Sequence, residues 1–337
     1  MKKTIIMLFV VILWSGSFNQ VEGRKSDYTY YSYGNEGDVT TSTTYGVNLM
    51  GGSTDVDEAM RWMTEKANGG DFVILRTSGS DGYNQYLYDL ALENQSDVDS
   101  VETILLKNRN ASYDAFVLDK VQKAEGIFFA GGDQFTYMDF IEGTPLEDTL
   151  NDLIQKGIPV GGTSAGLAIQ GEFVFDAANG TVYSDEALDD PYNQYMTFSK
   201  KFLSNDYLEN TITDSHFEQR DRMGRLVGFL SRQLLDGWTT EAKGIAVNEQ
   251  TALLIEEDGF ARVVVQPGGT NQSVYLAKSS TKPTNAAPLE IENVDVIKLK
   301  NGDTIDLQNW SSHTGSFYQL NVNNGNLFSS TGNIYGN

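Results

Sequence analysis

The stretch Ile158-Pro159-Val160-Gly161-Gly162-Thr163-Ser164-Ala165-Gly166 joins a short apolar strand to a glycine-rich turn that carries a serine. The pattern Gly-x-Ser-x-Gly directly after such a strand is typical of a sharp strand-to-helix turn that pushes the serine out of the sheet. The glycines relieve crowding around that turn. The alternative is a plain connection whose serine caps the next helix. We therefore expect an α/β fold with Ser164 at the carboxyl end of a strand.

The sequence before this stretch repeats the alternation of strand, glycine turn and helix. Apolar strands are expected at residues 47–50, 72–75 and 126–130. A helix is expected over 56–67, with Asp55 as its cap. Short, continuously apolar strands that alternate with helices favour a mainly parallel sheet with helices on both faces. In such a sheet the active site lies in the turns at the carboxyl ends of the strands.

After about residue 258 the sequence pattern changes from alternating strands and helices to a series of strands. Strands are expected at 261–265, 273–276 and 294–299, and Asn301-Gly302 predicts a hairpin between the last of these and Ile305. This part is either a small β-domain or a set of strands added to the main sheet. The expected organisation is a signal peptide over 1–23, a tyrosine-rich lead-in or edge strand over 24–45, a catalytic α/β domain over 46–258 and a β-rich extension over 259–337.

The N-terminal residues have the layout of a secretory signal peptide. Lys2 and Lys3 precede an apolar run over residues 5–14, and small and polar residues follow it. The run is shorter than the ~20 residues that span a bilayer, which disfavours the alternative of a membrane anchor. We therefore expect a secreted protein, extracellular or periplasmic, with no membrane contact after the signal peptide is cleaved.

The composition excludes several classes of function. The 337 residues include 24 Lys and Arg against 46 Asp and Glu, which gives a net charge of −22. This balance disfavours nucleic-acid binding, which needs a basic surface for phosphates, and attraction to anionic membranes. The chain has no cysteine and two histidines, which excludes disulfides, thiolate metal sites and a three-histidine zinc site within one chain. We expect no metal and no cofactor.

A second motif, between residues 214 and 225, contains one of the two histidines. A serine nucleophile needs a base with a pKa near 7, so the base is His216, His313 or neither. Three arginines and two aspartates surround His216 in the sequence, which favours a functional site over the alternative of a salt-bridged surface helix. On a helix, Arg222 and Arg225 would share a face, whereas Arg220 would point elsewhere. Arginines suit carboxylate ligands.

A third motif, Gly131-Gly132-Asp133-Gln134, also follows directly after a strand. Its glycines bring backbone N–H groups close to a ligand, and together with the N–H of Ala165 they could stabilise an oxyanion. Gln134 could hold a polar group of the substrate. The alternative is a tight turn without a ligand.

A catalytic triad also needs an acid that orients the histidine. Glu249 lies at the end of an apolar strand, and Asp214 lies two residues before the histidine. The spacing in the sequence does not choose between these two and the acids that lie between serine and histidine, which include Asp176, Asp185 and Glu186.

Taken together and in this order, the motifs Gly-Gly-Asp-Gln, Gly-Gly-Thr-Ser-Ala-Gly and Asp-x-His-Phe-x-x-Arg-x-Arg-x-Gly-Arg-Leu resemble the cyanophycinase family. These serine exopeptidases are related to peptidase E, and the resemblance covers about residues 46–258. It implies a fold similar to the class I glutamine amidotransferases, with a serine where those enzymes use cysteine. It also implies a peptide or polymer substrate and, by analogy with other members, a homodimer.

The resemblance assigns roles to single residues. It implies Ser164 as the nucleophile, His216 as the general base and Glu249 as the acid. It implies a substrate pocket formed by Gln134, Asp214, Arg220, Arg222 and Arg225. The chain differs from the family pattern at Asn248, where the family has Asp, and at Ser215, where the family has Gln. The second difference concerns the identity of the substrate rather than catalysis.

The implied activity is hydrolysis of cyanophycin or related β-aspartyl peptides to dipeptides such as β-Asp-Arg, through an acyl-enzyme. Three alternatives remain at this point. The first is an esterase of the α/β-hydrolase type with His313 as base. The second is a secreted protein of the same fold that binds a ligand without turning it over. The third is an adhesion protein whose active part is the β-rich extension.

Overall fold

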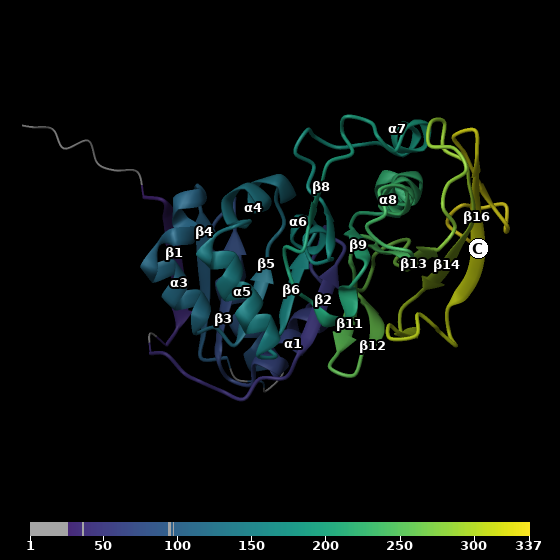
Figure 1. Ribbon diagram of the computed structural model, residues 1–337. Coiled ribbons are helices and arrows are strands. Elements are labelled where there is room, and N and C mark those ends of the chain that lie inside the picture. Colours follow the sequence, from purple (N-terminus) through teal and green to yellow (C-terminus); the bar gives the residue numbers. More distant parts are fainter. Residues whose placement is uncertain (1–25, 36, 94–95, 97) are drawn as a thin grey trace, which may run out of the picture.

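The computed structural model describes residues 26–35, 37–93, 96 and 98–337 of the chain, and the expected signal peptide over 1–23 lies outside these. Two β-sheets lie side by side, one built mainly from the first half of the chain and one from the second half (Figure 1). In the part of the chain that the structure describes, the first sheet has nine strands and the second has eight.

The first sheet has the strand order β1-β4-β3-β5-β6-β2-β11-β12-β15. Its central strands β4, β3, β5, β6 and β2 are parallel, and the others pair antiparallel at its two sides. Because parallel strands end at the same edge, the turns after β3, β5, β6 and β2 lie together there. The strands are β1 (Tyr28–Gly34), β2 (Gly46–Met50), β3 (Asp71–Arg76), β4 (Ser100–Leu106), β5 (Gly126–Phe129), β6 (Val160–Thr163), β11 (Thr251–Glu256), β12 (Phe260–Val265) and β15 (Thr304–Asp306).

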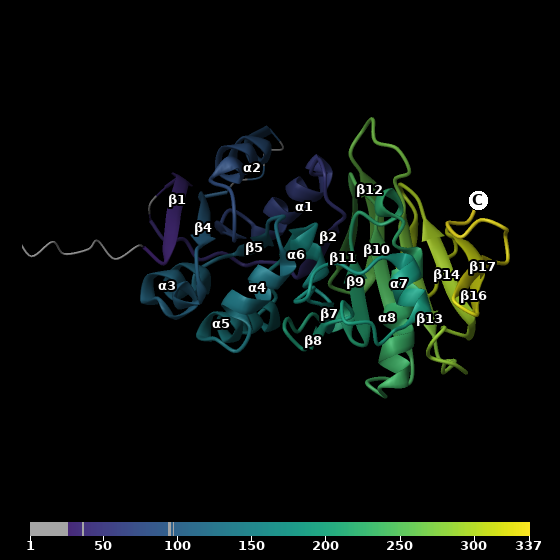
Figure 2. The same cartoon turned by 90° about the horizontal axis from the view of Figure 1, so that it is seen from above.

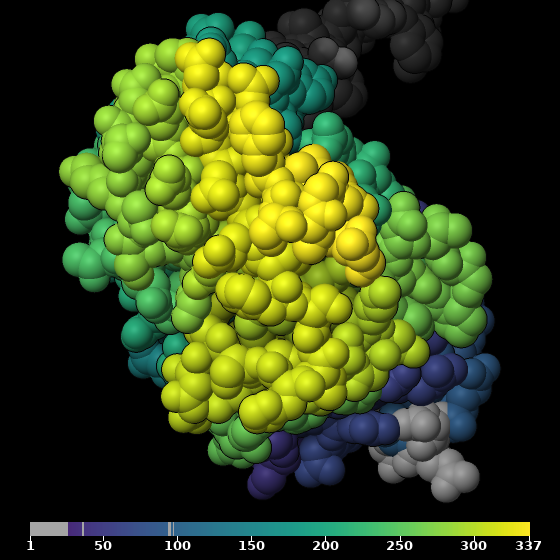
Figure 3. Space-filling model, turned by 90° about the vertical axis from the view of Figure 1, so that its right-hand side faces the viewer, coloured from purple at the N-terminus to yellow at the C-terminus, as the bar shows by residue number. Residues whose placement is uncertain are grey.

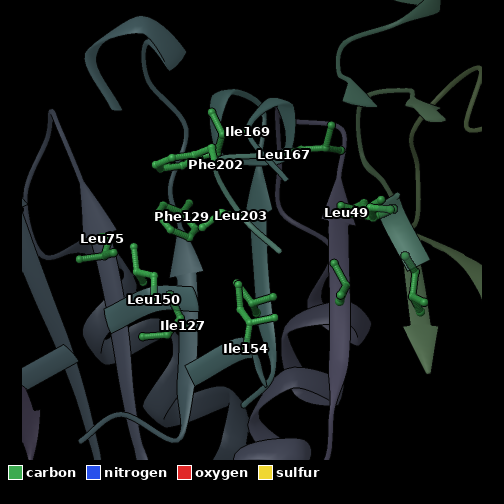
Figure 4. Packing of buried hydrophobic residues seen from close by; sticks show 14 of the residues in the cluster. Leu49, Leu75, Ile127, Phe129, Leu150, Ile154, Leu167, Ile169, Phe202 and Leu203 are labelled. Carbon is green, nitrogen blue, oxygen red and sulfur yellow. The ribbon is translucent and has the colours of Figure 1, made fainter. Parts of the chain in front are cut away.

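Helices cover both faces of this sheet. Figure 2 shows α1 (Asp57–Ala67) and α2 (Gly82–Glu93) on one face, and α3 (Ala115–Gln122), α4 (Gln134–Ile141) and α5 (Pro145–Gln155) on the other. The 3-10 helix η1 (Arg109–Tyr113) precedes α3. Successive residues of a strand point to opposite faces. In β3, Phe72 and Ile74 accordingly pack in the core under α1 and α2, and Val73 and Leu75 pack in the core under α3 to α5, part of which is shown in Figure 4. This explains why the strands are apolar without interruption.

The second sheet has the strand order β17-β16-β14-β13-β10-β9-β7-β8. Helices α7 (Ser184–Asp189) and α8 (Met223–Leu235) pack against each other, and the apolar side of α8 faces the core of this sheet. The remaining short helices are α6 (Ala165–Ala168), η2 (Asp206–Leu208) and η3 (Glu218–Arg220). The strands are β7 (Phe173–Phe175), β8 (Phe198–Lys200), β9 (Thr211–Asp214), β10 (Ala242–Val247), β13 (Val274–Ser279), β14 (Ile291–Leu299), β16 (Ser316–Asn323) and β17 (Asn326–Ser329).

The expected fold class is confirmed: a helix-covered, mainly parallel sheet is followed by a β-rich C-terminal part. The C-terminal strands join both sheets, because β12 and β15 extend the first and β13, β14, β16 and β17 extend the second. The last part of the chain covers much of the face that Figure 3 shows, where it is drawn in yellow. The boundaries of the expected domains stay a prediction.

Two local predictions were wrong. The hairpin expected at Asn301-Gly302 does not form, because β14 and β15 belong to different sheets and β15 pairs with β12. The turn itself is present, with the N–H of Asp303 donating to the carbonyl of Lys300. Asp55 does not cap α1, because the residue before the first helical turn is Val56 and no side chain caps it.

Among the described residues, no helix is both long and apolar enough to cross a bilayer.

Candidate active site

Ser164 lies between β6 and α6 in a strained backbone conformation. Its φ is +56° and its ψ −112°, a region that non-glycine residues occupy at a cost and mostly at functional sites. The turn is so tight that a Cβ on Gly166 would lie 2.0 Å from the carbonyl oxygen of Phe129, and one on Gly162 would lie 2.3 Å from the carbonyl oxygen of Gly166. The Gly-x-Ser-x-Gly pattern is therefore needed for the shape of the turn, and it exposes the serine at the carboxyl end of the strand.

His216 and Glu249 form a chain of contacts with this serine. Ser164 Oγ lies 2.7 Å from His216 Nε2, and His216 Nδ1 lies 2.7 Å from Glu249 Oε1. His216 is buried and also has a positive φ of +46°, whereas Ser164 and Glu249 are half-buried. The order hydroxyl, imidazole, carboxylate is the arrangement in which a histidine can take a proton from a serine.

The three residues come from different parts of the fold. Ser164 follows β6 of the first sheet, and His216 lies two residues after the end of β9 in the second sheet. Glu249 lies in the connection from β10 to β11, where the chain crosses from the second sheet to the first. The site is therefore assembled where the two sheets meet.

Residues 50–52, at the end of β2, hold the three segments of the site in place. The sequence indicated these residues only as the end of a strand. The carbonyl of Met50 accepts the N–H of Ser164 at 3.0 Å, and that of Gly51 accepts the N–H of His216 at 2.9 Å. The carbonyl of Gly52 accepts the N–H of Gln250, next to Glu249, at 3.0 Å. A Cβ on Gly52 would lie 2.5 Å from the ring of His216. The sequence pattern that could have indicated this role is the pair Gly51-Gly52 directly after an apolar strand. The pairs Gly131-Gly132 and Gly161-Gly162 have the same placement.

The Gly131-Gly132 turn lies beside the serine. A Cβ on Gly131 would lie 3.5 Å from Ser164 Cβ, and one on Gly132 would lie 3.4 Å from Thr77 Oγ1. Ala165 begins α6 directly after the serine. Of the three residues expected to stabilise an oxyanion, Gly131 and Ala165 thus adjoin the serine, and Gly132 lies beside Thr77.

A cavity of about 690 Å³ adjoins these residues. Gln134, at the start of α4, lines one side of it and donates its side-chain N–H to the carbonyl of Phe175 at 3.1 Å. Ser164 is not part of the wall, but the wall includes Asp133, directly after the Gly131-Gly132 turn. The wall also carries the three arginines of the second motif, Arg220, Arg222 and Arg225.

The three arginines differ in their partners. Arg225 donates from Nε to Asp214 Oδ2 at 2.8 Å and from Nη2 to Asp214 Oδ1 at 2.5 Å, and both residues are buried. Arg222 donates to the carbonyl of Ser215 at 2.7 Å and lies 3.5 Å from Asp214 Oδ1. Within the described residues, the guanidinium of Arg220 has no carboxylate within 4.0 Å. Arg220 is therefore the arginine whose charge is open to a ligand.

Asp214 is held as a buried anion. Burial by itself would raise its pKa, but the charges of Arg225 and Arg222, with the hydrogen bonds from Arg225 and the N–H of Ser215, lower it below its usual value. Asp214 is not part of the cavity wall. We infer that it supports the arginines rather than contacting a ligand directly.

Asn248 explains one difference from the family pattern. Its Oδ1 accepts the N–H of Glu218 at 3.0 Å, and its Nδ2 donates to Glu218 Oε2 at 3.1 Å. An aspartate at this position would place a second carboxylate against Glu218 and could not donate, so the amide matches its neighbour.

Other residues considered for the site lie elsewhere. His313 is exposed in the loop between β15 and β16. Asp176 accepts from Thr197 and from the N–H of Ala178, and Glu186 accepts the N–H of Tyr183. Asp185 lines a neighbouring cavity. Within the described residues, no group of three or more metal-ligating side chains is placed to hold a metal ion.

The surroundings of His216 favour its neutral form. Burial lowers the pKa of His216 below 6.5, the hydrogen bond to Glu249 opposes this, and the charges of Arg220 and Arg222 add to the lowering. A neutral imidazole at neutral pH can accept a proton from Ser164.

We expect this pKa to be visible in the pH dependence of the reaction. Activity that depends on neutral His216 falls as the pH falls through its pKa, so the acidic limb of kcat/KM should have its midpoint below pH 6.5. The measurement is a kcat/KM profile from pH 4.5 to 9 at constant ionic strength. A midpoint at or above 6.5 would contradict this environment for His216.

Sequence comparison finds known proteins that are similar to this chain. Residues 76–263 match the sequence profile of Peptidase family S51. The cyanophycinase of Synechococcus elongatus is 28% identical over 218 residues, which are 63% of this chain and 62% of that protein. The cyanophycinase of Geminocystis herdmanii is 28% identical over 203 residues, 59% of this chain and 68% of that protein. The match thus spans less than two thirds of the length of the first relative.

A solved structure shares the fold. The crystal structure of a peptidase from an acI-B1 actinobacterium superposes with a TM-score of 0.52 at 16% sequence identity, covering 79% of this chain and 98% of that one.

Proposed function

Because the chain belongs to peptidase family S51, a family of serine peptidases, we propose that it is a serine exopeptidase that hydrolyses cyanophycin or related β-aspartyl peptides. One observation carries the proposal: the chain of contacts Ser164–His216–Glu249 lies beside a cavity whose wall holds Arg220, which has no carboxylate partner among the described residues. The cyanophycinase relatives support the choice of substrate class.

The proposed reaction follows from these groups. His216 Nε2 takes the proton of Ser164 as its Oγ attacks the scissile carbonyl, and Glu249 stabilises the imidazolium that forms. The backbone N–H groups of Ala165 and the Gly131-Gly132 turn stabilise the oxyanion. The amine leaves with the proton from His216, and water then attacks the acyl-enzyme with His216 again acting as the base.

The cavity suits the end of a peptide chain rather than its middle. Arg220 offers a guanidinium to a free carboxylate, and paired hydrogen bonds make such contacts strong and directional. Gln134 adds a polar side chain to the same cavity wall. A site that requires a terminal carboxylate releases short products from a chain end, which is exopeptidase activity.

We also propose that the protein is secreted, because residues 1–23 have the pattern of a signal peptide. Expression of the full chain with its natural N-terminus should place the mature protein outside the cytoplasm, and sequencing of its N-terminus would give the cleavage site. Retention of residues 1–23 in the mature protein would contradict secretion by this route.

The experiment that tests the proposed activity uses the mature protein, residues 24–337. It is incubated with cyanophycin, with β-aspartyl dipeptides and with peptides that carry an N-terminal α-aspartate, and the products are identified by mass spectrometry. Release of β-Asp-Arg from cyanophycin is the expected result. Cleavage of the α-aspartyl peptides alone would keep the peptidase and replace its substrate, and the absence of all cleavage would favour a protein that only binds.

A further inference from the structure

The turn that carries two of the cavity arginines has an unfavourable backbone conformation. We call residues 217–223 the arginine turn; Asp221 lies in it between Arg220 and Arg222. Asp221 has φ +49° and ψ +55°, a left-handed conformation that a residue with a Cβ adopts at a cost. Such a turn needs contacts from outside to hold one geometry. The conformation of Asp221 sets the directions in which the two arginines leave the backbone.

Those contacts come from Tyr335, which lies 114 residues further along the chain. Its hydroxyl donates to Asp221 Oδ1 at 2.8 Å and accepts the N–H of Met223 at 3.4 Å. Its ring meets the ring of Phe217 edge-on, at a centroid distance of 6.1 Å. Tyr335 therefore contacts the beginning, the middle and the end of the arginine turn. On the opposite side, Ser184 donates its hydroxyl to the carbonyl of Asp221.

Tyr335 is itself fixed by the second sheet. Its carbonyl accepts Lys298 Nζ of β14 at 2.9 Å and the hydroxyl of Tyr275 of β13 at 3.4 Å. Tyr335 is thus a rigid support for the arginine turn. The neighbouring carbonyl of Ile334 accepts the hydroxyl of Tyr318 of β16 at 2.9 Å, a bond that does not involve Tyr335. Tyr335 also lies outside residues 76–263, so the match to the peptidase family does not include it.

We propose that Tyr335 is a positioning residue for substrate binding: it holds the arginine turn in the geometry that presents Arg220 and Arg222 to the cavity. This rests on the proposed function, since it assigns a role in the same cavity. The N–H of His216 donates to the carbonyl of Gly51, and the contacts of the Tyr335 side chain named above include neither His216 nor Ser164. Loss of the Tyr335 hydroxyl should therefore weaken substrate binding and leave the chemical step intact.

The test compares Tyr335→Phe with Tyr318→Phe in the mature protein. Tyr335→Phe removes the hydrogen bonds to Asp221 and Met223 and keeps the ring on Phe217. Tyr318→Phe is the matched control, because it removes one hydrogen bond to the same C-terminal segment without touching the arginine turn. With the best substrate, Tyr335→Phe should raise KM about three- to tenfold with kcat within about twofold, which is the size of one ordinary hydrogen bond, because Asp221 is exposed to water. Tyr318→Phe should leave KM within about twofold.

Equal KM values for Tyr335→Phe and the parent, or the same rise in both variants, would overturn the proposal. A second measurement decides it if the parent turns over no substrate, which would refute the proposed function alone. Amide hydrogen exchange of residues 217–223 should be faster in Tyr335→Phe than in the parent and unchanged in Tyr318→Phe. Unchanged exchange in Tyr335→Phe would show that the turn holds its geometry without Tyr335.

Discussion

Replacing Ser164 with alanine should lower kcat by at least about 10⁴-fold without unfolding the protein, because the variant loses the proposed nucleophile. Ser164 Oγ contacts His216 and adds little to packing, so the melting temperature should stay close to that of the parent. The measurements are kcat on the best substrate and thermal unfolding. A fluorophosphonate reagent should label the parent at Ser164 and leave the variant unlabelled.

Histidine variants are the control for this prediction. His216→Ala should lose activity to a similar extent, and His313→Ala, which changes an exposed loop residue, should retain it. Loss of activity in His313→Ala with retention in His216→Ala would favour the esterase alternative. Full activity in Ser164→Ala would exclude Ser164 as the nucleophile.

Replacing Glu249 with glutamine should lower kcat by about 10²- to 10⁴-fold and change KM little. The carboxylate accepts from His216 Nδ1 and stabilises the imidazolium of the transition state, whereas a neutral amide does not and can donate to Nδ1 instead. Glu249 is half-buried, so water can replace part of the lost interaction, which is why the range is wide. The measurement is kcat at saturating substrate.

The matched control is Glu257→Gln, which changes an exposed glutamate directly after β11 and should leave kcat unchanged. A kcat for Glu249→Gln within threefold of the parent would contradict a role of Glu249 in the reaction.

The parts of the fold that the sequence predicted are those with local causes. The strands of the parallel sheet follow from apolar runs buried on both faces, and the turn at Ser164 follows from glycines whose missing Cβ atoms make room for the backbone. The hairpin at Asn301-Gly302 failed because a turn signal describes four residues and not the partner of the strand that follows. Strand β15 pairs with β12, some 40 residues earlier in the chain, which no local pattern records.

Arg220 differs from Arg222 and Arg225 in its contacts, but the backbone of this segment is not the single helix on which the sequence spacing was considered. Arg222 and Arg225 both reach Asp214, and among the described residues no such contact is made by Arg220. The segment is not one helix, however, because η3 ends at Arg220, Asp221 is left-handed and α8 begins at Met223. The choice of Glu249 over other acids and the contact of Tyr335 with the arginine turn depend on how distant segments fold together. From the sequence, the choice among the acids therefore stayed open, and the contact of Tyr335 with the arginine turn could not be predicted.

The hydrogen bonds that the carbonyls of Met50, Gly51 and Gly52 accept have a consequence for how such a protein can change over time. They join the three reacting segments through backbone atoms, which side-chain substitutions do not remove. The cavity wall is instead made of side chains on other segments, such as Gln134 and Arg220. A lineage could therefore exchange one substrate for another by altering the wall, while the reacting groups keep their relative positions.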